Sequence, residues 1–119
     1  KTMWGGEIFV PKIPSYKITD VIKAINPYAK IKKIGVRPGE KINEEMISIH
    51  DSPNTLEAKN YFIIAPTLKF RNFKKEYLKK NKLFKSCKDN FSYNSKDNKN
   101  FLSIKKIKDL IKVNIKDFD

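Results

Sequence analysis

Residues 37–40 read Arg-Pro-Gly-Glu and combine a guanidinium, a rigid turn and a carboxylate. Proline followed by glycine predicts a tight turn, which brings the flanking arginine and glutamate close together. The guanidinium can fork onto a diphosphate, and the carboxylate can accept hydrogen bonds from a ribose diol. The alternative is an exposed ion pair across the turn, worth about 0–1 kcal/mol. On these four residues alone the ion pair is the simpler interpretation.

The sequence offers few groups for metal binding or nucleophilic catalysis. Cys87 is the single cysteine and His50 the single histidine, so a zinc or iron site of nitrogen and sulfur ligands cannot be assembled. No internal disulfide can form, which favours a reducing compartment, and we expect a cytoplasmic protein. A glycine-rich phosphate-binding turn is also missing, because Gly5-Gly6 precedes an apparent strand. We therefore expect no catalytic, cofactor-binding or metal-binding residue in this chain.

Tyr28 and Lys32 have the Tyr-x-x-x-Lys spacing of short-chain dehydrogenases. In those enzymes a helix places the lysine one turn from the tyrosine phenol. Here Pro27 precedes the tyrosine and an apparent strand begins at Ile31, so the two side chains would not share a helical face. We interpret the spacing as a chance match in a lysine-rich chain.

The formal net charge of +13 is concentrated in the second half of the chain. Residues 1–68 hold ten basic and seven acidic side chains, whereas residues 69–119 hold sixteen basic and six acidic ones. Only Arg37 and Arg71 are arginines, so the guanidinium fork that reads bases and grips phosphates is almost absent. We attribute the lysine excess to an A/T-rich coding sequence, and we do not expect nucleic acid as a partner.

A small basic nucleic-acid-binding module stays open as an alternative. Lysines that neutralise phosphates gain affinity by releasing counterions. Aromatic side chains between the lysines would then stack on bases. These aromatic residues are Phe70, Phe73, Tyr77, Phe84, Phe91 and Tyr93.

Three segments predict strands that would position these groups. Residues 7–12, 31–36 and 60–65 are short apolar or β-branched runs bounded by proline or glycine. Residues 41–49 fit neither the helical nor the strand period, and residues 51–55 are expected to form a loop. No apolar run approaches the ~20 residues of a transmembrane helix.

Helical periodicity is clearest in residues 18–25 and 104–111, where isoleucines, a valine and a leucine recur on one face. Ser15 or Thr19 is expected to cap the first helix, and Asn26-Pro27 to end it. Ser103 is expected to cap the last helix. A lysine-rich helix is expected around residues 73–78, and residues 89–100 are polar and predict a loop. The sum is an α/β segment with too few strands for a doubly wound fold.

Four ordered segments resemble one enzyme family. They read G-G-E-I-F-V-P-K-I-P-S-Y-K-I-T-D at 5–20, I-G-V-R-P-G-E-K-I-N-E-E-M-I-S at 34–48, D-S-P-N-T at 51–55 and F-S-Y-N-S-K-D-N-K-N-F-L-S at 91–103. In this order and spacing they closely resemble the C-terminal part of the inverting UDP-N-acetylglucosamine 4,6-dehydratases, a polysaccharide-biosynthesis branch of the extended short-chain dehydrogenases. Residues 67–90 show no such resemblance.

The resemblance implies an α/β fold: the C-terminal substrate-binding part of an extended short-chain dehydrogenase, with short strands, flanking helices and no Rossmann core. The parent enzyme would hold NADP in an N-terminal Rossmann domain, outside this segment. It would oxidise C4 of the sugar, eliminate water across C5 and C6, return the hydride to C6 and invert C5. The product would be a 4-keto-6-deoxy sugar nucleotide for surface glycans. Because the catalytic tyrosine, lysine and aspartate would lie upstream, the resemblance implies a fragment of a lyase that is inactive alone.

The substrate-binding residues of the family carry over onto the turn. By this resemblance Arg37 binds the nucleotide diphosphate and Glu40 binds the ribose. Lys41 and Lys12 are weaker candidates, since a lysine near a phosphate acts as a point charge. Asn43 departs from the family pattern, because a histidine is common after the G-E-K motif, and any role of that histidine does not carry over.

We therefore predict a nucleotide-sugar-binding segment at residues 1–68 and a basic C-terminal extension, ending in a helix, at residues 69–119. The expected partners are UDP-N-acetylglucosamine or a similar UDP-sugar, the protein's own N-terminal Rossmann domain and further copies in a homo-oligomer of the parent. No membrane partner is expected. A related sugar-nucleotide epimerase stays an alternative, because the hydride and proton chemistry is decided upstream of this segment.

Overall fold

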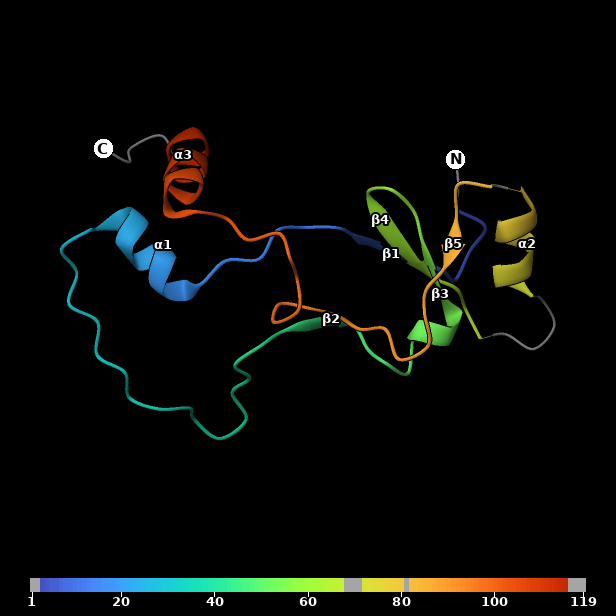
Figure 1. Ribbon diagram of the computed structural model, residues 1–119, viewed down its shortest axis with the longest axis horizontal. Helices are drawn as coiled ribbons and strands as arrows, with labels where there is room; N and C mark the ends of the chain where they lie inside the picture. The colour runs from blue at the N-terminus through green and yellow to red at the C-terminus, as the bar shows by residue number, and fades with distance from the viewer. Residues whose placement is uncertain (1–2, 68–71, 81, 116–119) are drawn as a thin grey trace. The chain divides into compact units, whose positions relative to one another are not determined.

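The computed structural model describes residues 3–67, 72–80 and 82–115. The chain forms two compact units that alternate along the sequence: Lys1–Lys12 with Glu45–Asn94 (unit 1), and Ile13–Glu44 with Ser95–Asp119 (unit 2). Helices and short strands are mixed, which confirms the predicted α/β class (Figure 1). The predicted segments 1–68 and 69–119 each contribute to both units and do not coincide with either one. Their expected roles, nucleotide-sugar binding and a basic extension, stay predictions.

Unit 1 is built on a four-stranded antiparallel sheet in the order β1-β4-β3-β5. The strands are β1 (Ile8–Pro11), β3 (Thr55–Glu57), β4 (Tyr61–Ile64) and β5 (Lys85–Ser86). The predictions of strands at residues 7–12 and 60–65 are confirmed by β1 and β4. β1 is an edge strand, which tolerates the missing N–H of its terminal proline.

Alternate side chains of the sheet bury two apolar clusters. Ile63 faces its cross-strand partner Leu56 in one cluster, and Phe62 faces its partner Val10 in the other. Because successive residues of a strand point to opposite faces, the two clusters lie on opposite sides of the sheet. Helix α2 (Phe73–Lys80) buries Phe73 and Tyr77 against the first cluster. The lysine-rich helix expected around residues 73–78 is thereby confirmed.

The second cluster is completed by a two-stranded antiparallel ribbon of β2 (Glu45–Ile47) and β6 (Tyr93–Asn94). Ile47 is fully buried against the sheet. The ambiguous residues 41–49 thus contain a short strand, and the expected loop at 89–100 contains its partner. The loop expected at residues 51–55 is wrong: it holds a 3-10 turn (Ser52–Asn54) and the start of β3. That strand exists because β4 and β5 flank it, a pairing that no local pattern reveals.

Glu7 is a buried carboxylate directly before β1, only 5% exposed. Its Oε1 accepts hydrogen bonds from the backbone N–H of Trp4 and from the Tyr77 hydroxyl, the latter at 2.6 Å. Burial alone would raise the pKa of Glu7, but these hydrogen bonds outweigh it and hold the pKa below its ordinary value. The Trp4 ring also stacks on Tyr77 at a centroid distance of 4.1 Å. Glu7 therefore links β1 to α2 across 70 residues of sequence.

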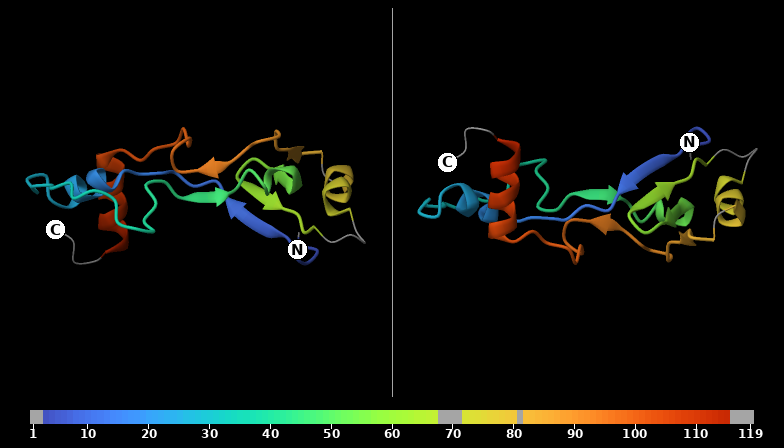
Figure 2. Two further views of the ribbon diagram at one scale, coloured as in Figure 1. Left: turned by 90° about the horizontal axis from the view of Figure 1, so that it is seen from below. Right: turned by 90° about the horizontal axis from the view of Figure 1, so that it is seen from above.

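Unit 2 contains helices α1 (Ile18–Ile25) and α3 (Ile104–Asn114), which pack against each other (Figures 1 and 2). Both predicted helices are confirmed, and α1 ends at Asn26 as expected. A parallel bridge between Ser15 and Phe101 brings the segments that precede the two helices side by side. Only Ala24 and Ile107 are buried among the described residues of this unit.

The two helices of unit 2 begin differently. Ser103 caps α3 as predicted, since its Oγ accepts a hydrogen bond from the N–H of Lys106. The cap expected for α1 is wrong: Lys17 occupies the N-cap position and makes no side-chain cap. Ser15 lies two residues before the N-cap position, and its Oγ accepts a hydrogen bond from Asn98 Nδ2 at 2.9 Å.

Residues 30–44 form a long exposed segment without helix or strand. The strand predicted at residues 31–36 is therefore wrong. A β-branched run forms a strand only when a neighbouring strand accepts its backbone hydrogen bonds, and no described strand pairs with it. Ile34 is left 72% exposed as a result.

Candidate functional site

The turn predicted at residues 37–40 is formed. Pro38 and Gly39 are its central residues, and Gly39 adopts a φ of +81°, a conformation that side-chain-bearing residues rarely adopt. The N–H of Glu40 donates to the carbonyl of Arg37 at 3.0 Å, which closes the turn. Proline at the second position and a positive-φ glycine at the third are the pattern of a type II turn. Local sequence alone thus brings Arg37 and Glu40 together.

The Glu40 carboxylate bonds to the main chain of the turn. Its Oε2 accepts a hydrogen bond from the backbone N–H of Arg37 at 2.9 Å. The ion pair weighed for this turn is not formed: among the described residues an ion pair joins Lys12 to Glu57 instead. The Arg37 guanidinium is therefore exposed and open to an anion.

The two lysine candidates differ in their surroundings. Lys41 follows the turn directly and is exposed. Lys12 belongs to unit 1, where its Nζ lies 2.6 Å from Glu57 Oε1 and 4.8 Å from the centre of the Phe62 ring. Part of its charge is thus already compensated. Arg37, Glu40 and Lys41 share one loop of unit 2, whereas Lys12 does not belong to that loop. Asn43 is exposed in the same loop.

Tyr28 and Lys32 do not form a dehydrogenase pair. Both lie after the end of α1 in a segment without helix, and Tyr28 is 91% exposed. The Tyr28 N–H donates to Asn26 Oδ1 at 2.9 Å, a local turn that leads the chain away from the helix. Without a helical turn the i and i+4 positions do not face each other.

No cluster of three metal-ligating residues occurs among the described residues. Cys87 is half-buried, and this burial, with the nearby charge of Glu57, raises the pKa of its thiol to about 11. A thiol that stays protonated is a poor nucleophile. Within the described parts of the chain, no helix is both long and apolar enough to span a membrane.

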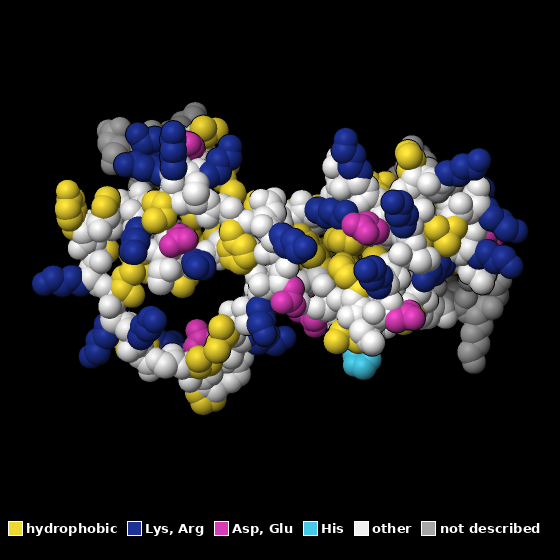
Figure 3. Space-filling view, in the orientation of Figure 1, with side chains coloured by type: hydrophobic (Ala, Val, Ile, Leu, Met, Phe, Trp, Pro, Cys, Tyr) yellow, Lys and Arg dark blue, Asp and Glu magenta, His cyan; other side chains and the backbone are white. Residues whose placement is uncertain are grey.

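The aromatic side chains proposed for base stacking are packed inside unit 1. Phe73, Tyr77 and Phe84 are each less than 10% exposed, and Phe91 and Tyr93 pack against Phe62. Phe70 lies outside the described residues. Lysines and arginines are scattered over the visible face of each unit and do not gather into one patch (Figure 3). This arrangement does not favour the nucleic-acid alternative.

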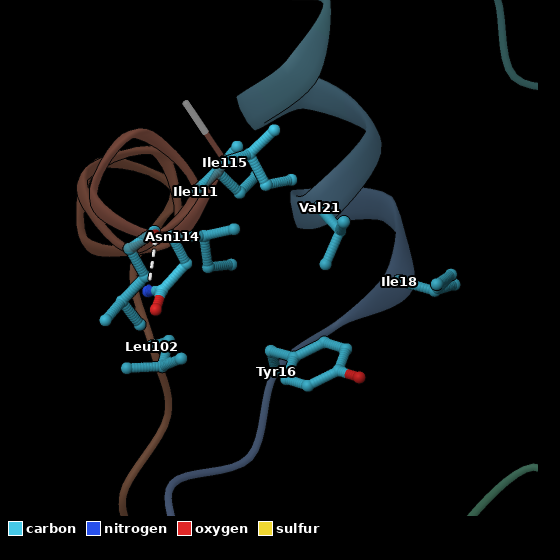
Figure 4. A pocket seen from close by; sticks show the side chains of 9 residues that line it. Tyr16, Ile18, Val21, Leu102, Ile111, Asn114 and Ile115 are labelled. Atoms are coloured by element: carbon cyan, nitrogen blue, oxygen red, sulfur yellow. Dashed lines mark hydrogen bonds between the residues drawn. The ribbon is translucent and has the colours of Figure 1, made fainter. Parts of the chain in front are cut away.

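A groove in unit 2 lies between α1 and α3, with a cavity volume of about 340 Å³. Tyr16, Val21, Leu102 and Ile111 line it, together with further apolar side chains (Figure 4). Its polar lining residue Asn114 donates from Nδ2 to the carbonyl of Leu110 within its own helix. No charged side chain lines the groove. It therefore does not suit a diphosphate, and the exposed turn stays the candidate site.

The buried acid Glu7 was not among the predicted site residues, and its sequence context indicated only the first position of a strand. The available signal was an acid directly after two glycines and before an apolar run, since both glycines adopt positive φ and turn the chain so that Trp4 donates to the carboxylate.

The fold defines the class of the chain, a mixed α/β segment of the kind found within longer proteins. The solved structure of Pen from Bacillus thuringiensis contains a similar fold, with a TM-score of 0.65 and 27% sequence identity. The match covers 92% of this chain and 32% of that chain.

Residues 1–66 match the model of a family described as polysaccharide biosynthesis protein. The chain belongs to this family. It is 43% identical, over 92% of its length, to a UDP-N-acetylglucosamine 4,6-dehydratase (inverting) of Campylobacter jejuni. It is also 36% identical over 91% of its length to an uncharacterised membrane protein of Methanocaldococcus jannaschii, and 30% identical over 89% to a UDP-glucose 4-epimerase of Rickettsia bellii. The chain spans about a third of the length of these relatives.

Proposed function

We propose that this chain is the C-terminal, substrate-binding part of an NADP-dependent UDP-sugar 4,6-dehydratase, and that Arg37 binds the diphosphate of UDP-N-acetylglucosamine or a similar UDP-sugar. The observation that carries the proposal is the turn at residues 37–40, which presents an exposed guanidinium without an ion-pair partner among the described residues. It lies in a chain 43% identical to an inverting UDP-N-acetylglucosamine 4,6-dehydratase. Lys41, next to the turn, adds a point charge for the same diphosphate.

In this proposal NADP and the catalytic groups belong to an N-terminal Rossmann domain of a cytoplasmic, homo-oligomeric parent. Two observations support a missing packing partner. The relatives are about three times as long as the chain. Unit 2 also exposes large apolar side chains, including Ile18 at 68% and Ile42 at 80%, which suit an interface. The chain alone would then bind the nucleotide sugar without turning it over.

Nucleotide binding by the chain tests this function. We expect UDP to shift the backbone amide resonances of Arg37, Gly39, Glu40 and Lys41 in an NMR titration. Replacing Arg37 by alanine is expected to weaken UDP binding by roughly 10- to 100-fold, since hydrogen bonds to charged groups contribute about 1.5–3 kcal/mol.

The matched control is Lys33→Ala, which removes one positive charge from the same exposed segment. It should change the affinity for UDP less than 3-fold, as expected for an exposed charge worth about 0–1 kcal/mol. Equal losses in the two variants would mean that only net charge attracts the nucleotide, and the assignment of Arg37 would be withdrawn. Uridine without phosphate should not bind.

A UDP-sugar epimerase is the second candidate for the parent, favoured by the 30% identity to a UDP-glucose 4-epimerase. Both candidates share a UDP-sugar, so binding by this chain does not separate them. Assay of the full-length parent with UDP-N-acetylglucosamine separates them, because elimination of water forms a 4-keto-6-deoxy product and epimerisation does not.

A further inference from the structure

The Arg37–Glu40 turn is closed by two hydrogen bonds that run in opposite directions. The Glu40 N–H donates to the Arg37 carbonyl, and the Arg37 N–H donates to the Glu40 carboxylate. Each end of the turn is therefore fixed by the other. The second bond depends on the Glu40 side chain, so a substitution of Glu40 can remove it while the first bond, which joins two backbone groups, remains possible.

Within the described residues, no further hydrogen bond is made by the turn itself, and the segment is next held at its end, where the backbone of Glu44 bonds to Ser95. Every residue from 30 to 44 is exposed, and none belongs to a described helix or strand. An exposed loop without packing samples many conformations unless local bonds restrain it. The direction in which Arg37 presents its guanidinium therefore depends on the hydrogen bonds of the turn.

The Glu40 carboxylate bonds to the backbone of Arg37 and not to its guanidinium. Had the carboxylate paired with the guanidinium, it would have competed with a phosphate for the same fork of N–H donors. It accepts instead from the Arg37 amide, which leaves the guanidinium free while the carboxylate restrains the backbone beneath it.

We propose that Glu40 is a positioning residue for diphosphate binding, acting through Arg37 by holding the turn closed. This inference rests on the proposed function of Arg37. It assigns Glu40 a task on the phosphate side of the ligand, whereas a direct contact with the ribose would act only on the sugar side.

Inorganic pyrophosphate separates the two roles, because it has a diphosphate and no ribose. If Glu40 only contacts the ribose, replacing it should leave the affinity for pyrophosphate unchanged. The affinity could also rise slightly, since the replacement removes a negative charge near the phosphates. If Glu40 positions Arg37, replacing Glu40 should lower the affinity for pyrophosphate. Glutamine keeps an acceptor oxygen but no charge, so Glu40→Gln should retain the wild-type affinity for pyrophosphate, whereas Glu40→Ala should weaken it.

The experiment measures Kd for pyrophosphate and UDP by NMR titration, at one ionic strength, for the wild type, Glu40→Ala, Glu40→Gln and Glu44→Ala. Glu44 is the matched control because it is an exposed acid of the same segment whose backbone N–H, bonded to Ser95 Oγ, survives the change. We expect Glu40→Ala to weaken pyrophosphate binding about 2- to 10-fold, the effect of one hydrogen bond. For pyrophosphate, Glu40→Gln and Glu44→Ala should stay within 2-fold of the wild type.

Hydrogen exchange of the Arg37 amide gives a readout that needs no ligand. It should be faster in Glu40→Ala than in the wild type or Glu40→Gln. If the wild type binds UDP while Glu40→Ala binds pyrophosphate as tightly as the wild type, the positioning role is overturned and the proposed function stands. If the wild type binds neither ligand, the proposed function fails, and the positioning role for a diphosphate fails with it.

Discussion

The conformations of unit 1 and of the exposed segment 30–44 of unit 2 are stabilised by different interactions. Unit 1 buries Leu56, Ile63 and Tyr77 between a sheet and a helix, and adds a hydrogen-bonded acid at their edge. The segment 30–44 has no buried residue, and its turn at residues 37–40 is closed by two hydrogen bonds. Burial supplies kilocalories per side chain, whereas a solvent-exposed hydrogen bond supplies a fraction of that.

This difference predicts that residues of unit 1 determine the stability of the protein and that residues of the segment determine ligand binding. Substitutions in unit 1 should unfold the protein without touching the candidate ligand site, and substitutions in the segment should alter binding without loss of stability. A substitution in the segment that lowers the stability, or one in unit 1 that leaves the protein folded but weakens ligand binding, would contradict this prediction.

The largest effect is expected at the centre of the unit 1 sheet. Ile63→Ala removes a fully buried side chain, and such changes cost about 2–5 kcal/mol because a cavity remains. The same change at Ile34, which is 72% exposed, should cost less than about 0.5 kcal/mol. Urea unfolding followed by circular dichroism measures both. Comparable losses at the two positions would mean that the exposed segment is packed in solution.

An intermediate effect is expected at the bond between Glu7 and Tyr77. Tyr77→Phe removes a hydrogen bond to a buried carboxylate, which should cost about 1–3 kcal/mol near neutral pH. The cost should depend on pH. Because the native pKa of Glu7 is lowered, its contribution is complete above the unfolded pKa of about 4.3 and is lost as pH falls through the native pKa.

The check is the free energy of unfolding of the wild type minus that of Tyr77→Phe, measured from neutral pH down to about pH 3. This difference should shrink as Glu7 is protonated, and it should be small throughout in a Glu7→Gln background. A difference that stays constant with pH would assign the cost to ring packing against Trp4 instead.

The smallest effect is expected at the start of α3. Ser103→Ala removes the oxygen that accepts from the Lys106 N–H and should cost about 0.5–2 kcal/mol. The helix α1 lacks such a cap, so Thr19→Ala should cost less than the loss at Ser103. Urea unfolding of both variants tests this order, and an equal cost would show that the Ser103 bond adds nothing in water.

The sequence predicted the elements whose signals are local. The spacing of isoleucines gave α1 and α3, the serine before α3 gave its cap, and proline followed by glycine gave the turn that joins Arg37 to Glu40. Each signal acts within one helical turn or four residues, so it needs no distant partner.

The tertiary structure decided what depends on residues far apart in the chain. The run at 31–36 has the composition of a strand but no described strand beside it, while residues 55–57 form a strand because β4 and β5 flank them. Lys12 pairs with Glu57, and Glu7 with Tyr77, across 45 and 70 residues. A strand or a buried carboxylate is stable only when its hydrogen-bond partners are in place. The sequence by itself therefore determined the helices and the turn at residues 37–40, and the fold determined the sheet and the long-range pairs that Lys12 and Glu7 form.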